Sequence, residues 1–387
     1  MKHTLILLTS LLLTPLAAVH GQPPHPPVVD ISGETERHVI IAQGTETDWQ
    51  GHPHTLLLPD GRTIFCVWQG RQDGTGRHGA PGGLLKRSND GGLSWSELLD
   101  VPANWKENGR GSPTIHRLVD AQGVARLFVY CRDEKRTTFL HAMSEDEGKT
   151  WSPLQPLRRS NTAEPPITGW TAPISILEAR GPDGRCKHLM WYERGRDGKP
   201  VPGVIWQSSS YDGGLTWGES KPVVDKAGAS EPTAIRSPDG KQIVFTSTRD
   251  STKFEARRIY VMDADGSRMR RLTFDQDIDF HPSVRHNGQI VYSRWDYTGI
   301  NRIFLRPVMS MNPDGTSQKA IYGSNSWFPN GLYYPKELPG QIGKFLCVLA
   351  GYHGSHRSGT LCVIDINKGT KEDEGIVCQI SGTGKPV

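Results

Sequence analysis

Two stretches of this sequence hold residues whose types suit acid–base chemistry on an acidic ligand. The first carries Arg71 and Asp73 just after an apolar run, and the second begins with Glu231 and ends with Arg249. Arginine grips carboxylates through parallel N–H donors, and aspartate or glutamate can act as a general acid or base. A solvated ion pair, or an acid that accepts hydrogen bonds from loop amides, is the alternative interpretation of each stretch. The elements that position these residues therefore matter.

One eight-residue phrase, Ser-x-Asp-x-Gly-x-x-Trp, occurs three times in the first 220 residues. The copies span 88–95, 144–151 and 210–217, so their serines are 56 and then 66 residues apart. Self-similarity at this period indicates a repeated unit of the size of a four-stranded propeller blade. Within the phrase, aspartate accepts hydrogen bonds from its own loop, glycine allows a positive φ, and tryptophan packs between neighbouring sheets. The phrase is therefore structural.

Apolar strand-like runs precede each copy, with Pro-Asp-Gly turns at 59–61 and 182–184 before the first and third, which makes three blades. From about residue 237 the phrase is absent, and a Pro-Asp-Gly turn, a strand and a second strand closed by Asp-Ala-Asp-Gly replace it, giving roughly three further units. The 43 glycines and 28 prolines favour turns over long helices. We expect an all-β fold, a six-bladed β-propeller of four-stranded antiparallel blades, with the first pattern over 45–225 and the second over 226–387.

The amino terminus reads as an export signal. Residues 1–21 combine a short basic start, an apolar stretch too short and broken for a stable membrane span, and small residues at the cleavage position. A Pro-rich lead with a possible closing strand follows over 22–44. The sequence thus predicts a secreted or periplasmic protein with no stable membrane span after signal cleavage.

Charge and composition limit the classes of partner and cofactor that we expect. The formal net charge of +4 comes from evenly mixed signs, and the dense basic run 268–271 is expected to be a solvated blade edge, so we expect no nucleic-acid partner. The fourteen histidines are scattered without ligand spacing, so no metal or other cofactor is expected. The six cysteines mostly lie in apolar runs, which favours buried thiols, although an oxidising compartment permits one or two disulfides of unspecified pairing.

The two patterns resemble two known propeller families. About residues 45–250, with the three phrases known there as Asp boxes, resemble the sialidase (neuraminidase) superfamily of six-bladed propellers. About residues 232–368 look like the TolB-type propeller repeat of periplasmic protein-binding and ligand-binding blades. Asp-box propellers also include non-catalytic binding proteins.

The sialidase resemblance implies roles for the residues named first. It implies that Arg71 binds substrate and Asp73 transfers a proton, that Glu231 assists catalysis, and that Arg249 binds a carboxylate. The family's first arginine lies in a Phe-Arg-Ile-Pro motif, and the corresponding 50–53 here reads Gln-Gly-His-Pro without an arginine. For the nucleophile, Tyr333 and Tyr334 are candidates by late position alone, and packing is the common role of such tyrosines.

Two functions remain open at this level. One is a secreted, sialidase-like exo-glycosidase acting on an acidic glycan at the central mouth. The other is a non-catalytic TolB-like propeller that binds a protein or polysaccharide of the cell envelope. Tryptophans outside the boxes could stack on sugar rings at the mouth, although blade packing is the commoner role.

Overall fold

The computed structural model of this 387-residue chain describes most of it beyond the amino-terminal lead. The described residues are 28–30, 33–34, 36, 38–71, 83–169, 171–180, 185–194, 204–225, 233–250, 257–275, 278–295, 306–324, 326, 331–350 and 359–381, with the backbone alone at 28–30, 71, 225 and 381.

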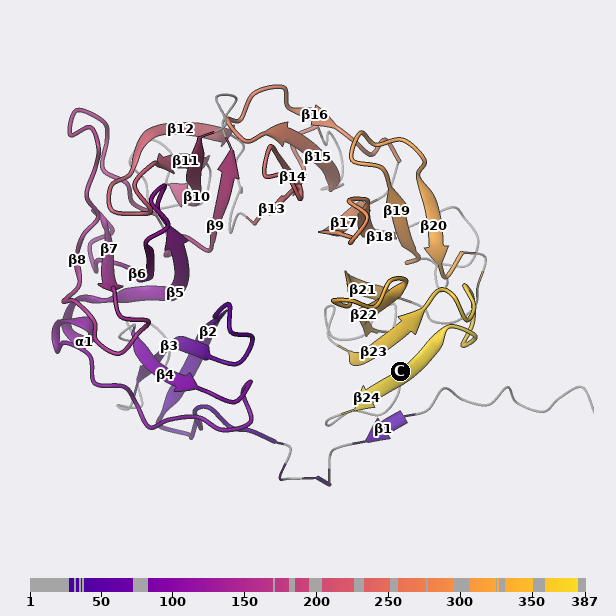
Figure 1. The fold of residues 1–387 in the computed structure, drawn as a ribbon, viewed down its shortest axis with the longest axis horizontal. Coiled ribbons are helices and arrows are strands. Elements are labelled where there is room, and N and C mark those ends of the chain that lie inside the picture. The colour runs from indigo at the N-terminus through magenta and orange to yellow at the C-terminus, as the bar shows by residue number, and fades with distance from the viewer. Residues whose placement is uncertain are drawn as a thin grey trace, which may run out of the picture.

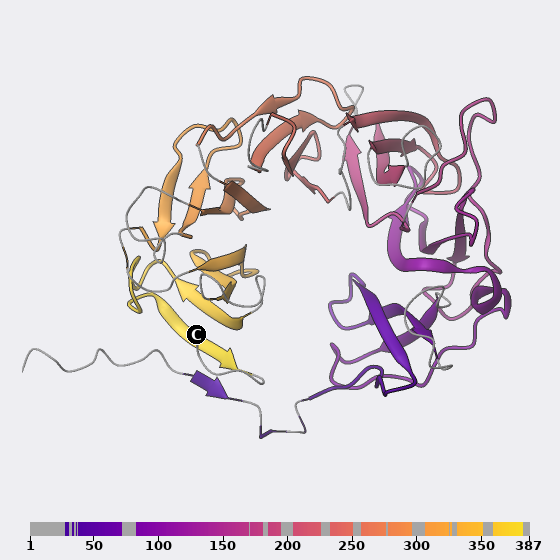
Figure 2. The same ribbon diagram turned by 180° about the vertical axis from the view of Figure 1, so that it is seen from behind.

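Six sheets stand around a central channel, each with its first strand innermost (Figure 1; Figure 2 gives the reverse face). Blade 1 holds β2 (Trp49–Leu57), β3 (Ile64–Arg71) and β4 (Leu84–Ser88). Blade 2 holds β5 (Arg110–Val119), β6 (Ala125–Arg132), β7 (Phe139–Ser144) and β8 (Gln155–Pro156). Blade 3 holds β9 (Ser175–Arg180), β10 (Cys186–Arg194), β11 (Val204–Ser210) and β12 (Gly218–Asp225).

The second half of the chain continues the same order. Blade 4 holds β13 (Ile235–Arg236), β14 (Gln242–Ser247), β15 (Arg258–Asp263) and β16 (Arg270–Arg271). Blade 5 holds β17 (Ile278–Val284), β18 (Ile290–Trp295), β19 (Val308–Met311) and β20 (Lys319–Tyr322). Blade 6 holds β21 (Leu332–Glu337), β22 (Lys344–Leu349), β23 (Thr360–Asp365) and β24 (Ile376–Ser381).

These sheets confirm the all-β, six-bladed prediction, with two variations on the four-stranded blade. In blade 1 the position of a fourth strand is taken by a segment that makes two backbone hydrogen bonds to β4, from Ser96 and Leu99 (both 2.9 Å). Blade 6 gains a fifth, parallel strand, because β1 (Val28–Asp30) pairs with β24. The short α1 (Asn104–Asn108) is the helix that the described residues contain, and none of their helices is long and apolar enough to span a bilayer.

The three Ser-x-Asp-x-Gly-x-x-Trp phrases fold as the same closed turn. In the second, the Ser144 hydroxyl donates to Asp146 and accepts from the Gly148 amide (both 2.8 Å). The Thr150 amide and hydroxyl donate to Asp146 at 2.9 and 2.6 Å. Hydrogen bonds from Thr150 hold the pKa of the Asp146 carboxyl well below its usual value. The other two copies repeat these bonds, so the phrase acts as a blade fastener.

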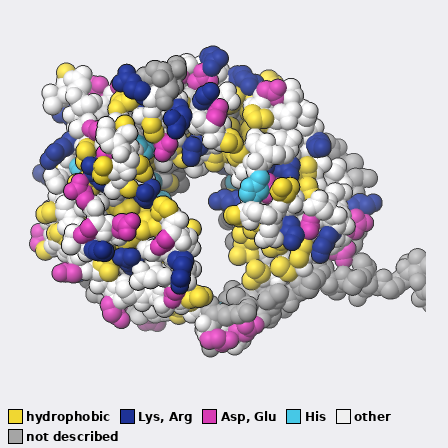
Figure 3. Space-filling model, in the orientation of Figure 1, with side chains coloured by type: hydrophobic (Ala, Val, Ile, Leu, Met, Phe, Trp, Pro, Cys, Tyr) yellow, Lys and Arg dark blue, Asp and Glu magenta, His cyan; other side chains and the backbone are white. Residues whose placement is uncertain are grey.

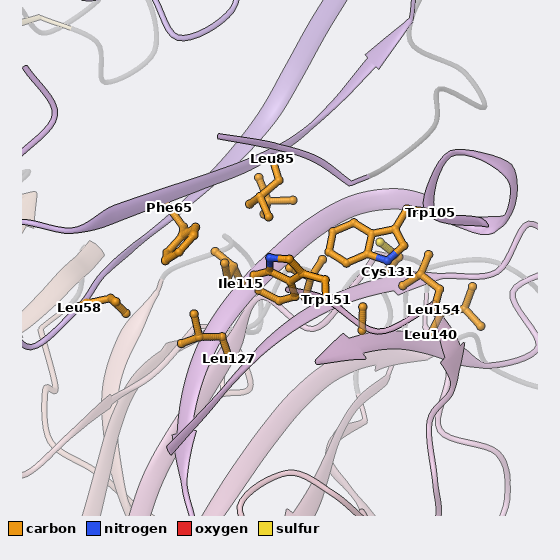
Figure 4. Packing of buried hydrophobic residues seen from close by; sticks show 13 residues of the cluster. Leu58, Phe65, Leu85, Trp105, Ile115, Leu127, Cys131, Leu140, Trp151 and Leu154 are labelled. Atoms are coloured by element: carbon orange, nitrogen blue, oxygen red, sulfur yellow. The ribbon is translucent and has the colours of Figure 1, made fainter. Parts of the chain in front are cut away.

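The tryptophans of the second and third phrases pack against the preceding blade. Trp151 of blade 2 lies edge-on to Phe65 of blade 1, and Figure 4 shows both in the core between those blades. Trp217 of blade 3 is buried in a cluster with Phe128 of blade 2. For Trp95 of blade 1, the preceding blade around the ring is blade 6. Figures 1 and 3 show that blades 6 and 1 stand apart. Trp95 is accordingly only half-buried.

Candidate functional site

The two ends of the channel carry different connections. Turns between first and second strands, and the Asp-box turns between third and fourth strands, share one end because the blades are antiparallel meanders. The ends of second strands and the starts of first strands share the opposite end. Arg71 is the last residue of β3, and Arg249 follows β14, so their backbones lie at this second end. We call it the loop end.

Of the four predicted site residues, the structure describes Arg249 in full and Arg71 by its backbone alone. Asp73 and Glu231 lie outside the described residues. Arg71 pairs with Trp49 in the β2–β3 register, and its side chain is outside the description. The convergence of these residues with Arg249 on one ligand therefore stays a prediction.

Arg249 is engaged within its own blade. Its guanidinium lies 5.2 Å from the Phe245 ring centre and 5.0 Å from that of Tyr260, and it contacts the Met269 sulfur. The Tyr260 hydroxyl donates to Asp250 at 2.6 Å. Burial lowers the pKa of Arg249, although an arginine stays charged at neutral pH. This arrangement is typical of a cation packed on aromatic rings.

A second set of loop-end residues emerges from irregularities in the innermost strands. The strand register shifts near the start of β2, β5, β17 and β21. In three of these bulges the residue before a proline is non-glycine with positive φ, namely His52 (52°), His281 (54°) and Tyr334 (54°). In β5 the positive φ falls on Gly111 (77°), two residues before Pro113.

The backbones of these three residues lie in the left-handed region, which residues other than glycine, asparagine and aspartate rarely adopt. Bulges redirect a side chain relative to the regular pleat, and strained backbone of this kind clusters at functional sites. The bulges therefore mark three aromatic or imidazole side chains at the loop end as candidates for ligand contact.

Two of the three meet. The rings of His281 and Tyr334 stack with centres 3.7 Å apart and planes 21° apart, joining the innermost strands of blades 5 and 6. Tyr334 is 44% exposed, so the pair presents an aromatic face to solvent. Figure 3 shows histidine and basic side chains gathered beside the channel at these blades.

Further rings and a cation support this pair. Tyr333, which is buried, stacks on Phe280 with centres 5.9 Å apart. The guanidinium of Arg306 lies 4.7 Å from the Trp295 ring centre and 5.5 Å from that of Tyr333. We call the six residues the blade 5–6 aromatic cluster: Phe280, His281, Trp295, Arg306, Tyr333 and Tyr334.

Blade 1 carries a related arrangement. His52 is exposed, its Nδ1 lies 2.8 Å from Gln69 Oε1, and its ring meets Trp49 edge-on at 5.5 Å. The Trp68 indole N–H donates to Gln50 at 2.6 Å. The Gln-Gly-His-Pro sequence, which lacks the expected arginine, thus forms the bulge of β2 and fixes its histidine by hydrogen bonding and ring contact.

Sequence reasoning missed these bulges although a signal for them exists. A series of X-Pro dipeptides recurs along the sequence, with prolines at 53, 113, 173, 232, 282 and 335. Those at 53, 113, 282 and 335 lie within the innermost strands β2, β5, β17 and β21. Successive prolines are 60, 60, 59, 50 and 53 residues apart, and the series runs through both sequence patterns. The residue before the proline is variable and includes Glu231, the predicted catalytic acid, together with His52, His281 and Tyr334.

Buried charges of blade 5 serve packing. Arg294 Nε donates to the fully buried Asp279 at 2.8 Å, and Arg294 also pairs with Asp275 at 3.0 Å. Burial raises the pKa of Asp279. Within the described ranges, no group of three or more histidine, cysteine or acidic residues is arranged to hold a metal ion.

Fold and site together define a six-bladed β-propeller with an aromatic and basic loop end. No protein-family model matches the sequence, and no curated protein matches it.

Solved propellers do match the fold at low identity. A putative TolB from Agrobacterium tumefaciens is 17% identical over 84% of this chain and 90% of its own, with a TM-score of 0.39. An α-L-arabinanase from Penicillium chrysogenum is 15% identical, covers 83% and 94%, and has a TM-score of 0.45. An α-L-arabinofuranosidase from Fusarium graminearum has the same identity, coverage and score. These likenesses carry no assignment of activity, and membership of the sialidase superfamily stays a prediction.

Proposed function

We propose that this protein is a secreted, sialidase-like, glycan-active propeller that binds an acidic sugar at its loop end. The observation that carries the proposal is the stacked pair of His281 and Tyr334, held by two strained bulges and partly exposed. Aromatic faces pack against the apolar faces of sugar rings and give a rigid contact at low entropic cost.

The charge near this pair fits an acidic ligand. The buried guanidinium of Arg306 lies 5.5 Å from the ring centre of Tyr333, so a permanent positive charge lies close to the aromatic pair. Positive charge near a ligand site raises the local concentration of anions and favours a sugar that bears a carboxylate. The blade 5–6 aromatic cluster therefore combines an exposed aromatic ring with a positive charge close to it, and both favour an acidic sugar.

Glycoside cleavage would fall to the acids named from the sequence. In this proposal Asp73 transfers the proton to the leaving oxygen, Glu231 assists the second step, and Arg71 and Arg249 bind the carboxylate. Support comes from the fold, since the end of β3 and the end of β14 lie at the same end of the channel as the cluster.

A second candidate function is a non-catalytic, TolB-like propeller that binds an envelope protein or polysaccharide. The packing of Arg249 on Phe245 and Tyr260 favours it, because that guanidinium is already occupied by ring contacts. In this case the cluster binds a ligand that is not turned over.

One experiment separates the two. The full chain is tested for retention on immobilised acidic and neutral glycans and for hydrolysis of chromogenic sialosides and a glycan panel. We expect Tyr334→Ala to weaken retention of acidic glycans about tenfold, equivalent to about 1.4 kcal/mol. The matched control is Phe274→Ala, because Phe274 is 72% exposed and has Arg271 4.7 Å from its ring centre, but follows the outermost strand β16.

Turnover that disappears in a combined Asp73→Asn and Glu231→Gln variant supports the glycosidase. Retention without turnover supports the binding protein. Absence of retention for every glycan, or an equal loss in the Phe274 control, contradicts a saccharide site on this cluster.

A further inference from the structure

Two cysteines of blade 6 face each other across neighbouring strands. The register of β22 and β23 pairs Cys347 directly with Cys362. Directly opposed residues of an antiparallel pair have Cα atoms about 4.5–5.5 Å apart, within the roughly 4.4–6.8 Å that a disulfide requires. Both side chains are buried in the same core cluster, and the two thiols hydrogen-bond to each other.

The other cysteines lack such a partner. Cys378 pairs with Val363 rather than with Cys362, and because side chains alternate along a strand, its thiol points to the opposite face of the sheet. Cys66, Cys131 and Cys186 belong to three different blades. Among the six cysteines, all of them described, Cys347 and Cys362 are the one pair that the strand register places directly opposite each other.

We propose that Cys347 and Cys362 form a cross-strand disulfide when the chain folds in the presence of a small disulfide oxidant. One thiolate attacks the oxidant, giving a mixed disulfide and releasing one small thiol. The second cysteine attacks its neighbour's sulfur and releases the other small thiol. The protein loses two hydrogens and two electrons, and the oxidant disulfide is reduced to two thiols.

Burial of the two thiols determines at which stage of folding the disulfide can form. Cys347 is 1% exposed and Cys362 is fully buried, so an oxidant cannot reach them in the folded blade. The hydrogen bond to Cys362 and burial both raise the pKa of the Cys347 thiol, which leaves little thiolate to react. The bond therefore forms before the blade 6 core closes, and the same core then shields it from reductants.

The site of the bond matters for the ring. Blade 6 is the terminal blade: it stands apart from blade 1 and carries β1 on its edge (Figure 1). A link between β22 and β23 restricts unfolding of a blade that has a neighbouring blade on one side only. Oxidation is thus expected to raise the thermal stability of the molecule from this end.

The test folds the full chain with oxidised or with reduced glutathione, alkylates it, and maps its peptides by mass spectrometry without reduction. We expect one disulfide, joining the peptides of Cys347 and Cys362, and a Tm several degrees higher in the oxidised sample. Cys362→Ala should abolish this redox difference, and Cys378→Ala should retain it.

Full alkylation of both thiols after oxidative folding, or a bond to another cysteine, overturns the proposal. The peptide map of the unsubstituted chain decides the matter if Cys362→Ala does not fold. None of these outcomes depends on saccharide binding, so the inference stands or falls apart from the proposed function.

Discussion

Tyr334 holds a backbone conformation that is unusual for its residue type. Its φ of 54° belongs to the left-handed region, yet the ring it presents is what stacks on His281. Natural proteins tolerate such strain where a side chain must be aimed, and the surrounding strands hold it in place. The strain and the exposed ring can be separated by substitution.

Two variants make that separation. Tyr334→Asn and Tyr334→Val both remove the ring, but asparagine tolerates the left-handed region and a β-branched valine does not. We expect Tyr334→Val to be less stable than Tyr334→Asn by about 1–2 kcal/mol, and both to lose glycan retention. Urea denaturation measures the difference. Equal stability of the two variants would contradict backbone strain at this position.

Buried histidines give the molecule a stability that depends on pH. Loss of solvation lowers the pKa of His54 and His188, of His116 to about 3 and of His141 to about 4, from a usual 6.5. Because the folded values are lower, folding favours the neutral rings. The stabilisation is complete above the unfolded pKa and is lost as pH falls from 6.5 toward the folded values.

We therefore expect Tm to fall between about pH 7 and about pH 5. His141→Phe removes one titrating group and keeps a ring beside Phe128 and Tyr130, so its Tm should fall less over this range. Thermal unfolding followed by circular dichroism at each pH measures both slopes. A variant slope as steep as that of the unsubstituted chain would exclude His141 as a contributor.

At the scale of elements, turns formed within one short segment could be predicted from sequence, whereas contacts between distant strands could not. The Asp-box turns were predictable because all their bonds join residues within one phrase, as between Asp146 and Thr150. The stacking of His281 on Tyr334 joins residues 53 positions apart, and it depends on which innermost strands become neighbours. The X-Pro series runs through both halves of the chain, whereas the Asp boxes occur in the first 220 residues alone.

The box tryptophans offer a comparison between identical elements in different surroundings. Trp151 lies in the core between blades 1 and 2, where it also meets Trp105 edge-on at 5.5 Å. Trp95 occupies the same place in its phrase and is only half-buried. Gly148 of the second turn lies against Phe65, so the element as a whole is fitted to the preceding blade.

We expect Trp151→Ala to cost about 3–5 kcal/mol of stability, as other buried aromatic truncations do, and Trp95→Ala distinctly less. Chemical denaturation of both variants measures the two costs side by side. If Trp95→Ala were as destabilising as Trp151→Ala, blade 1 would have to be packed against blade 6 in solution, and the ring would be closed there.

At the scale of the whole molecule, blades 5 and 6 are joined at both ends of the channel. Glu337, at the end of β21, accepts hydrogen bonds from Arg285 (3.1 Å) and from the amides of His286 (2.8 Å) and Gly343 (2.9 Å). Burial opposes ionisation of Glu337, but these donors prevail and lower its pKa. At the loop end, the stack of His281 and Tyr334 joins the same two blades.

We expect Glu337→Gln to destabilise the protein by about 3 kcal/mol, because it leaves the buried Arg285 charge without its counter-ion. Arg268→Ala is the matched control: that pair with Asp263 lies within blade 4, its arginine is 81% exposed, and its loss should cost less than about 1 kcal/mol. Urea denaturation gives both costs, and glycan retention is measured below the unfolding transition. Glycan retention should persist in folded Glu337→Gln, because the stack of His281 and Tyr334 joins the same blades independently. Loss of retention would mean that the ion pair at the opposite end of the channel positions the aromatic pair.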